Sequence, residues 1–125
     1  MHVRVLLPGR NNLVYMHWAT RNMLGELLAF GIDVRYQSPP FVHSKLFVVD
    51  RGYAIIGSAN IDPRSLRLNF ELATEVYCDE TAATLADHCE RIAARSRPVT
   101  QAEVDERPLP VRIRDATCWL FSPYL

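Results

Sequence analysis

The spacing of apolar positions divides the first third of the chain into a strand, a helix and a second strand. Residues 3–7 form a short apolar run that ends at Pro8-Gly9, which predicts a buried strand followed by a turn. Residues 12–30 carry apolar side chains three and four positions apart, which predicts a helix with Asn12 as its N-cap. The expected apolar face of this helix comprises Met16, Ala19, Met23, Leu27 and Phe30.

The helix leads directly into a second strand. Gly31 follows the helix at the position where a C-cap residue in the left-handed conformation is expected, and residues 32–36 predict the strand. Strand, helix and strand with short connections form a βαβ unit, so we expect the two strands to be parallel with a right-handed crossover. The chain opens directly on a buried-looking strand, as half of a larger domain would.

The middle of the chain has the pattern of a β-hairpin. Residues 41–49 predict a third strand and residues 53–57 a fourth, joined by a tight turn at Asp50-Arg51-Gly52. Residues 72–77 predict a fifth strand. Together with the helices, these strands indicate an α/β fold, which we expect to be a mixed, mostly parallel β-sheet flanked by helices.

Helical spacing returns in the last third of the chain. Residues 81–94 have apolar positions typical of one helix face. Thr100 is an N-cap candidate with Glu103 at the capping-box position, which predicts a short helix. Residues 111–120 have an apolar side and predict a final helix, and no run approaches the roughly 20 apolar residues of a membrane span.

Composition and charge reduce the number of functional classes to which the chain could belong. Hydrophobic residues make up 49% of the 125 residues, so the chain is expected to be globular rather than disordered. Lys and Arg number 14, as do Asp and Glu, so there is no net charge, whereas nucleic-acid-binding proteins are usually basic. The cysteines Cys78, Cys89 and Cys118 are odd in number and form no CxxC pair, which indicates reduced thiols and argues against a zinc site.

The candidate chemistry lies in residues 43–71. His43 and Lys45 are two apart on the expected third strand, so their side chains point to the same face. Ser58 and Asn60 follow the next strand, and a hairpin brings them beside the first pair. Each residue alone has an ordinary structural explanation. Their joint spacing, with four residues between Lys45 and Asp50 and six residues between Asp50 and Gly57, makes a chance arrangement improbable.

These residue types suit chemistry on a phosphodiester. Its anionic oxygens repel nucleophiles, so a cation such as Lys45 and donors such as Asn60 and Ser58 must gather around them. The neutral imidazole of His43 is a strong, uncharged nucleophile. A carboxylate bound to its other ring nitrogen would fix the tautomer, and Glu71 is the candidate. A second histidine would protonate the leaving alcohol.

At these positions the sequence resembles the phospholipase D superfamily, whose signature has the same residue types at the same spacing. Asn69-Phe70-Glu71 also resembles the Asn-x-Glu that follows in many members. The resemblance implies that the histidine is the nucleophile, that lysine and asparagine hold phosphate, and that the glutamate orients a histidine. The implied catalytic set is His43, Lys45, Asp50, Asn60 and Glu71. The implied phosphate-binding set is Lys45, Ser58 and Asn60.

Nearly the whole chain resembles the C-terminal half of bacterial cardiolipin synthases, from residues 3–8 to the ending at residues 122–125. That family joins two phosphatidylglycerol molecules into cardiolipin and releases glycerol. The resemblance implies a phosphatidyltransferase that works through a phosphohistidine and needs no cofactor or metal. It also implies a phospholipase D-like catalytic domain with one half-site at residues 1–97, and a C-terminal helical tail at residues 98–125.

Family members carry two such half-sites, and this chain has one. We therefore expect a second half, either in a longer chain or in a homodimer. A homodimeric phosphodiesterase or nuclease is the second hypothesis, and an inactive fragment that only binds a partner half is the third. Zero net charge favours the first. The expected partner is a phosphatidylglycerol-like phospholipid rather than nucleic acid.

The expected location is the bacterial inner membrane, with the chain cytoplasmic or membrane-associated. Residues 111–120, with Trp119 among them, are candidates for peripheral contact with a bilayer. Packing of this helix against the domain is the favoured explanation of its apolar side. Tyr15, His17 and Trp18 are considered as lining a substrate groove, with ordinary helix packing again favoured.

Overall fold

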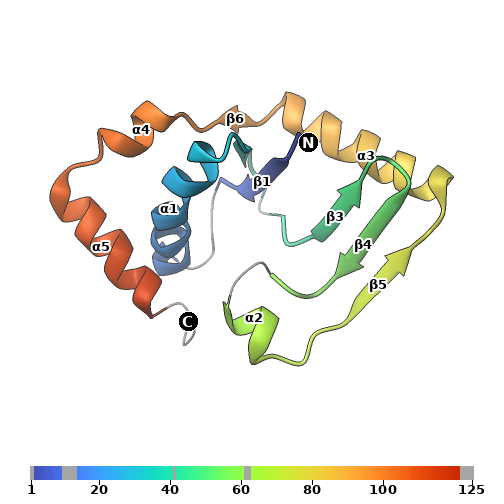
Figure 1. Cartoon of the computed structure of the whole chain (residues 1–125), viewed down its shortest axis with the longest axis horizontal. Helices are drawn as coiled ribbons and strands as arrows, with labels where there is room; N and C mark the ends of the chain where they lie inside the picture. The colour runs from blue at the N-terminus through green and yellow to red at the C-terminus, as the bar shows by residue number, and fades with distance from the viewer. Residues whose placement is uncertain (1, 10–13, 41, 61–62, 122–125) are drawn as a thin grey trace. The chain divides into compact units, whose positions relative to one another are not determined.

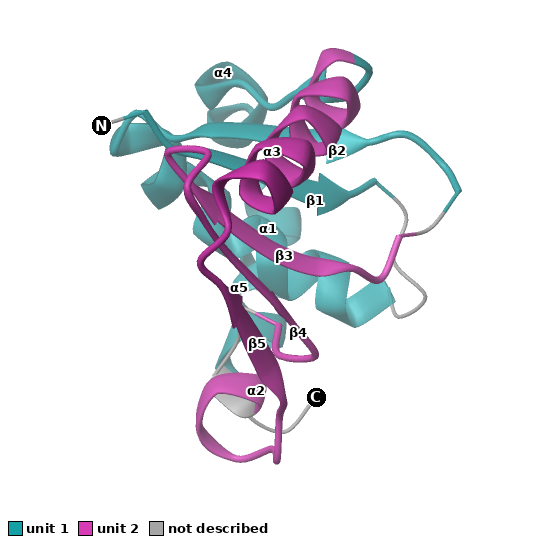
Figure 2. Ribbon diagram, turned by 90° about the vertical axis from the view of Figure 1, so that its right-hand side faces the viewer, with its two compact units in different colours: residues 1–41, 95–125 teal, residues 42–94 magenta. Residues whose placement is uncertain are grey.

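The computed structural model describes residues 2–9, 14–40, 42–60 and 63–121, and the chain forms two compact units (Figures 1 and 2). Unit 1 comprises residues 1–41 and 95–125, and unit 2 comprises residues 42–94. The C-terminal segment therefore belongs to the same unit as the first strand and helix. Among the described residues, no helix is both long enough and apolar enough to cross a membrane.

Unit 1 is built on a three-stranded sheet. Strand β1 (Arg4–Pro8) pairs in parallel with β2 (Asp33–Gln37), with Val5 opposite Val34, so the expected parallel pair is confirmed. A two-residue strand, β6 (Arg97–Pro98), pairs antiparallel with β2. It was not expected from the sequence, because two residues carry no periodicity and the pairing partner lies more than 50 residues away.

The described part of unit 1 also contains the helices α1 (Val14–Ala29), α4 (Gln101–Asp105) and α5 (Leu109–Leu120). Helix α1 packs against α5, α4 and β2. Thr100 is the N-cap of α4, and its side chain accepts a hydrogen bond from the amide of Glu103 at 3.2 Å, as expected. The buried core consists of Leu24, Val34, Val99 and Val104, with partly buried neighbours from β1, α1 and β2.

The expected apolar face of α1 is partly wrong. Phe30 is 75% exposed, because α1 ends at Ala29 and Gly31 turns the chain away with a φ of 75°. Leu24, which was not assigned to the face, is only 3% exposed and belongs to the core. The proposed N-cap, Asn12, lies outside the described residues.

A buried carboxylate holds the C-terminal helix in unit 1. Asp115 on α5 has no exposed surface, and it accepts hydrogen bonds from Arg107 at 2.9 Å and from Arg114 at 2.6 Å. Arg21 of α1 lies 3.7 Å away. The Arg114 guanidinium also lies over the Trp18 ring, 4.1 Å from its centre. A buried charge is tolerated only when it is paired, and here guanidinium groups surround it.

Unit 2 contains an antiparallel sheet of β3 (Lys45–Val49), β4 (Tyr53–Gly57) and β5 (Ala73–Val76). Helix α3 (Asp79–Ala94) packs on β3 and β4, and the short α2 (Pro63–Arg67) lies between β4 and β5 in the chain. The expected α/β class is confirmed. The expected predominance of parallel strands is wrong for the described residues, because β1–β2 is the one parallel pair there.

The β3–β4 turn explains the antiparallel pairing. Asp50 and Arg51 have φ values of 46° and 59°, and the amide of Gly52 donates to the carbonyl of Val49 at 3.1 Å. These values are those of a type I′ turn, whose twist matches that of a hairpin. The Arg51 guanidinium also binds the Asp87 carboxylate of α3 at 2.7 Å.

Strand β3 begins later than expected, at Lys45. Its opposite residue is Gly57, the last residue of β4, and after it Ser58 bonds instead to Leu72 beside β5. Residues 42–44 therefore have no β4 residue opposite them, and His43 precedes the strand rather than lying on it. Phe41, the expected strand start, lies outside the described residues.

Candidate active site

The motif residues of unit 2 gather at one end of the β3–β4–β5 sheet. His43 stands two residues before β3, and Glu71 stands two residues before β5. Ser58 follows β4 directly, and Asn60 comes two residues later. Because β4 runs antiparallel to both β3 and β5, the starts of β3 and β5 and the end of β4 lie at the same end of the sheet, which we call the site edge. His43, Ser58, Asn60 and Glu71 are exposed, so this edge is open to a substrate.

Lys45 links β3 to the segment that carries the histidine. It is the first residue of β3 and is half-buried. Its Nζ donates a hydrogen bond to the carbonyl oxygen of His43 at 2.9 Å. The ammonium therefore lies at the backbone of the candidate nucleophile, and His43 and Lys45 form one side of the site.

Gly57 is required by the close approach of β5. A Cβ at this position would lie 2.9 Å from the carbonyl oxygen of Leu72 and 3.2 Å from the Cβ of Ala73. The neighbouring amide of Ser58 donates to that same Leu72 carbonyl at 2.9 Å. Glycine thus lets the strands meet where the site residues emerge, and it holds Ser58 beside the residue that follows Glu71.

The Glu71 carboxylate is held by several donors. The Ser58 hydroxyl donates to its Oε2, and the Asn69 amide donates to its Oε1 at 3.3 Å. The hydrogen bond from Ser58 is the main reason why the pKa of Glu71 lies below its ordinary value. Burial, the next largest effect, opposes it, and the hydrogen bonds from Asn69 and Ser65 and the charge of Lys45 lower the pKa further. The carboxylate is therefore ionised throughout the neutral range.

Ser65 of α2 was not assigned to the site from the sequence. It is 7% exposed and is hydrogen-bonded to Glu71. The five-residue helix that carries it is too short to produce a recognisable apolar period. The one feature of the sequence that indicates Ser65 is its position as a small polar residue shortly after the Gly-Ser-x-Asn segment, and such a position is weak evidence by itself.

Asp50 lies at the other end of the hairpin. It occupies the first central position of the β3–β4 turn, five residues along the chain from Lys45. At about 3.3 Å per strand residue, this separation is about 16 Å along β3. The structure therefore brings together His43, Lys45, Ser58 and Glu71, with Asn60 at the same edge, and it leaves Asp50 apart from them.

Comparison with known protein families assigns the chain to one of them. The family described as "Cardiolipin synthase, PLD-like domain" matches residues 1–93, which include the whole site. The chain belongs to this family. The segment of this PLD-like domain that matches the family extends from β1 through nearly all of α3.

Curated cardiolipin synthases are similar to this PLD-like domain over its full length. The major cardiolipin synthase ClsA of Bacillus subtilis is 37% identical over 123 residues, which cover 98% of this chain and 26% of ClsA. A cardiolipin synthase of Geobacillus sp. (strain WCH70) is 36% identical over 126 residues, covering 100% of this chain and 25% of that protein. The chain thus spans about a quarter of the length of these relatives.

A solved structure shows a similar fold. It is the crystal structure of a phospholipase D family member, Nuc from Salmonella typhimurium. The TM-score is 0.66, with 23% sequence identity, and the match covers 79% of this chain and 64% of that one. At this identity the likeness supports the fold of the PLD-like domain, and the chemistry must be argued from its own residues.

Proposed function

We propose that this chain supplies one half-site of a phosphatidyltransferase of the cardiolipin synthase type. The substrate is phosphatidylglycerol, and the products are cardiolipin and glycerol. A second half-site, in the same protein or in a second copy, completes the centre. The reaction takes place at the bacterial inner membrane, because its substrate and its main product are membrane phospholipids.

In the first step, an imidazole nitrogen of His43 attacks the phosphorus of phosphatidylglycerol. The bond from phosphorus to the oxygen of the head-group glycerol breaks, and a histidine of the second half-site protonates the leaving glycerol. The product is a phosphatidyl-histidine. Lys45 and Asn60 carry the charge and the hydrogen bonds that the phosphoryl oxygens need, and Ser58 adds a donor to them when its hydroxyl turns away from Glu71.

In the second step, a hydroxyl of another phosphatidylglycerol attacks the same phosphorus. Its proton passes to the histidine that acted as the acid, and the bond to His43 breaks. The energy of the phosphodiester is kept in the covalent intermediate, so no nucleotide is consumed. Exclusion of water decides between transfer and hydrolysis. Since His43 and Asn60 are exposed in this chain, the second half-site is the expected cover.

The observation that carries this proposal is the meeting of His43, Lys45, Ser58 and Glu71 at one sheet edge, in a chain of the cardiolipin synthase family. The ionised Glu71 carboxylate is a suitable base to stabilise a positively charged imidazole. We assign Asp50 to the turn, as a supporting residue.

The test is a chimera in which this chain replaces the matching quarter of Bacillus subtilis ClsA. The chimera is incubated with phosphatidylglycerol vesicles, and cardiolipin, glycerol and phosphatidic acid are quantified. We expect cardiolipin and glycerol in equal amounts, and their loss in the His43→Ala chimera. Phosphatidic acid as the main product would indicate a hydrolase, and full activity of His43→Ala would exclude His43 as the nucleophile.

The chain without the rest of ClsA is assayed in parallel, together with its molecular mass in solution. Turnover by a dimer of this chain would support the homodimeric alternative. Binding of DNA that weakens steeply with salt would favour a nuclease over a phosphatidyltransferase.

A further inference from the structure

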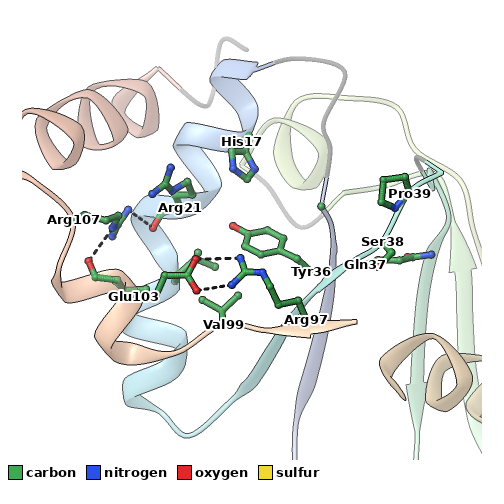
Figure 3. A pocket seen from close by; sticks show the side chains of 13 residues that line it. His17, Arg21, Tyr36, Gln37, Ser38, Pro39, Arg97, Val99, Glu103 and Arg107 are labelled. Atoms are coloured by element: carbon green, nitrogen blue, oxygen red, sulfur yellow. Dashed lines mark hydrogen bonds and ion pairs between the residues drawn. The ribbon is translucent and has the colours of Figure 1, made fainter. Parts of the chain in front are cut away.

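Unit 1 contains a pocket that the site in unit 2 does not use. Its volume is about 520 Å³, within the range of small-molecule sites, and residues of α1, β2, β6 and α4 line it (Figure 3). We call it the α1–β2–α4 pocket. Its ionisable side chains are His17, Arg21, Tyr36, Arg97, Glu103 and Arg107.

The pocket has an excess of positive charge. Three arginines and one glutamate line it. Arg97 is neutralised, because it donates to both carboxylate oxygens of Glu103, at 2.7 and 3.1 Å. Arg21 is not neutralised to the same degree, since the carboxylate with which it pairs among the described residues, Asp115, is 3.7 Å away.

The same buried carboxylate is shared with other cations. Arg107 and Arg114 bind Asp115 at shorter distances than Arg21 does, 2.9 and 2.6 Å. Three guanidinium groups therefore face one carboxylate. This arrangement leaves net positive charge beside the pocket, and a bound anion would balance it.

Tyr36 contributes an unused donor. Its hydroxyl is buried, and among the residues that the structure describes it has no hydrogen-bond partner. In Figure 3 this hydroxyl points toward the side of the pocket where Arg21 and His17 lie. Burial is the main cause that raises the pKa of Tyr36, so the phenol keeps its proton and can donate. A buried donor without a partner is costly unless a ligand supplies the acceptor.

His17 adds a second polar group that is uncharged. Its ring lies 5.7 Å from the ring of Tyr36, between centres. Burial, followed by the charge of Arg21, lowers the pKa of His17, so the imidazole is neutral at pH 7. Gln37 and Ser38 also line the pocket, and the Ser38 hydroxyl donates to the carbonyl of Arg95 at 3.3 Å. The pocket therefore combines a cation with neutral donors.

We propose that the α1–β2–α4 pocket binds the phosphate group of a phosphate ester, with the Arg21 guanidinium and the Tyr36 hydroxyl as donors to its oxygens. Ser38 precedes His43 by only five residues in the chain. That the ester is the head group of a phospholipid rests on the proposed function, whereas the binding of phosphate does not.

The test is calorimetric titration of the chain with inorganic phosphate and with glycerol 3-phosphate. Tyr36→Phe removes one donor and is expected to weaken binding about tenfold. Arg21→Gln removes the charge and is expected to weaken binding at least as much. Arg112→Gln, at an exposed position of α5, is the matched control and should change affinity less than twofold. Sedimentation with phosphatidylglycerol vesicles, for the same variants, tests the lipid as the source.

The Tyr36→Phe variant separates binding from folding. In the parent chain the Tyr36 hydroxyl has no hydrogen-bond partner within the described residues. Its removal should therefore leave the urea midpoint unchanged or higher while the affinity for phosphate falls. Tighter binding of glycerol 3-phosphate than of phosphate supports a head-group site, and equal binding supports a site for free phosphate. No binding of any probe, or equal loss in Arg112→Gln, would overturn the proposal. A chimera without transferase activity whose pocket still binds phosphate would count against the proposed function alone.

Discussion

The Ser58 hydroxyl donates a hydrogen bond to the Glu71 carboxylate, joining the end of β4 to the segment before β5. The same hydroxyl oxygen accepts a hydrogen bond from the amide of Leu72 at 3.0 Å. Ser58 is thus a bridge between two parts of the motif that lie 13 residues apart. Its hydrogen bond lowers the pKa of Glu71 and helps to fix the position of the carboxylate.

Removal of this bridge is expected to raise the pKa of Glu71. The hydrogen bond from Ser58 is the largest of the effects that lower this pKa from 4.5, so in Ser58→Ala the pKa moves back toward 4.5. A folded-state pKa below the unfolded value contributes stability above that unfolded value, and this stability is lost as the pH falls through the folded pKa. The stability difference between the parent and Ser58→Ala should therefore be constant near pH 7 and shrink in acid.

The measurement is a carboxyl-carbon NMR titration of Glu71, with urea unfolding at several pH values. Thr84→Ala, which removes a hydroxyl that donates to a backbone carbonyl on α3, is the control and should leave the Glu71 titration unchanged. A Glu71 pKa that does not move in Ser58→Ala would contradict the role given to this hydrogen bond.

Asp50 is expected to be dispensable for the reaction. It occupies a left-handed turn position at the far end of the hairpin, and asparagine tolerates this conformation. Asp50→Asn in the ClsA chimera should keep its kcat within about twofold and its stability within about 0.5 kcal/mol. Lys45→Gln, at the other end of β3, should lower kcat by about a hundredfold or more.

Steady-state kinetics on phosphatidylglycerol vesicles compare the two variants. If Asp50→Asn lost as much activity as Lys45→Gln, the carboxylate would have a catalytic role that its position in the turn does not explain. A loss of stability alone would instead indicate a structural contribution of the turn.

Asp115 is expected to be the most sensitive charged position in unit 1. Asp115→Asn would leave Arg107, whose side chain is 12% exposed, against a neutral amide, and breaking a buried ion pair costs about 3–5 kcal/mol. Asp105→Asn, at an exposed position that accepts one hydrogen bond from Gln101, should cost less than about 0.5 kcal/mol. Urea unfolding of both variants measures the difference, and equal midpoints would show that the buried carboxylate does not hold α5.

Local signals explain why much of the fold was predictable. The parallel β1–β2 pair follows from two short apolar runs around a helix, and the hairpin follows from the turn at residues 50–52. Helices α3 and α5 have regular apolar spacing. In contrast, β6 and α2 contain two and five residues, too few for any period, and their formation depends on partners distant in the chain.

The site was predictable where sequence spacing alone determines it. The positions of Lys45, Ser58 and Glu71 follow from the motif and the hairpin, whereas the strand boundary at Lys45 depends on where β4 ends. The buried Asp115 and the unpartnered hydroxyl of Tyr36 were not predictable, because burial arises from packing between α1, α5 and β2. His17, considered as a groove residue, does line the α1–β2–α4 pocket.

The central claim is that His43 becomes bonded to phosphorus. The ClsA chimera is mixed with phosphatidylglycerol for a few milliseconds, quenched in base to preserve phosphohistidine, digested and analysed by tandem mass spectrometry. We predict a phosphatidyl adduct on the peptide that contains His43, with its fragments placing the added mass on the imidazole. Turnover at the normal rate with an adduct on another residue, or with His43 replaced by alanine, would contradict the account.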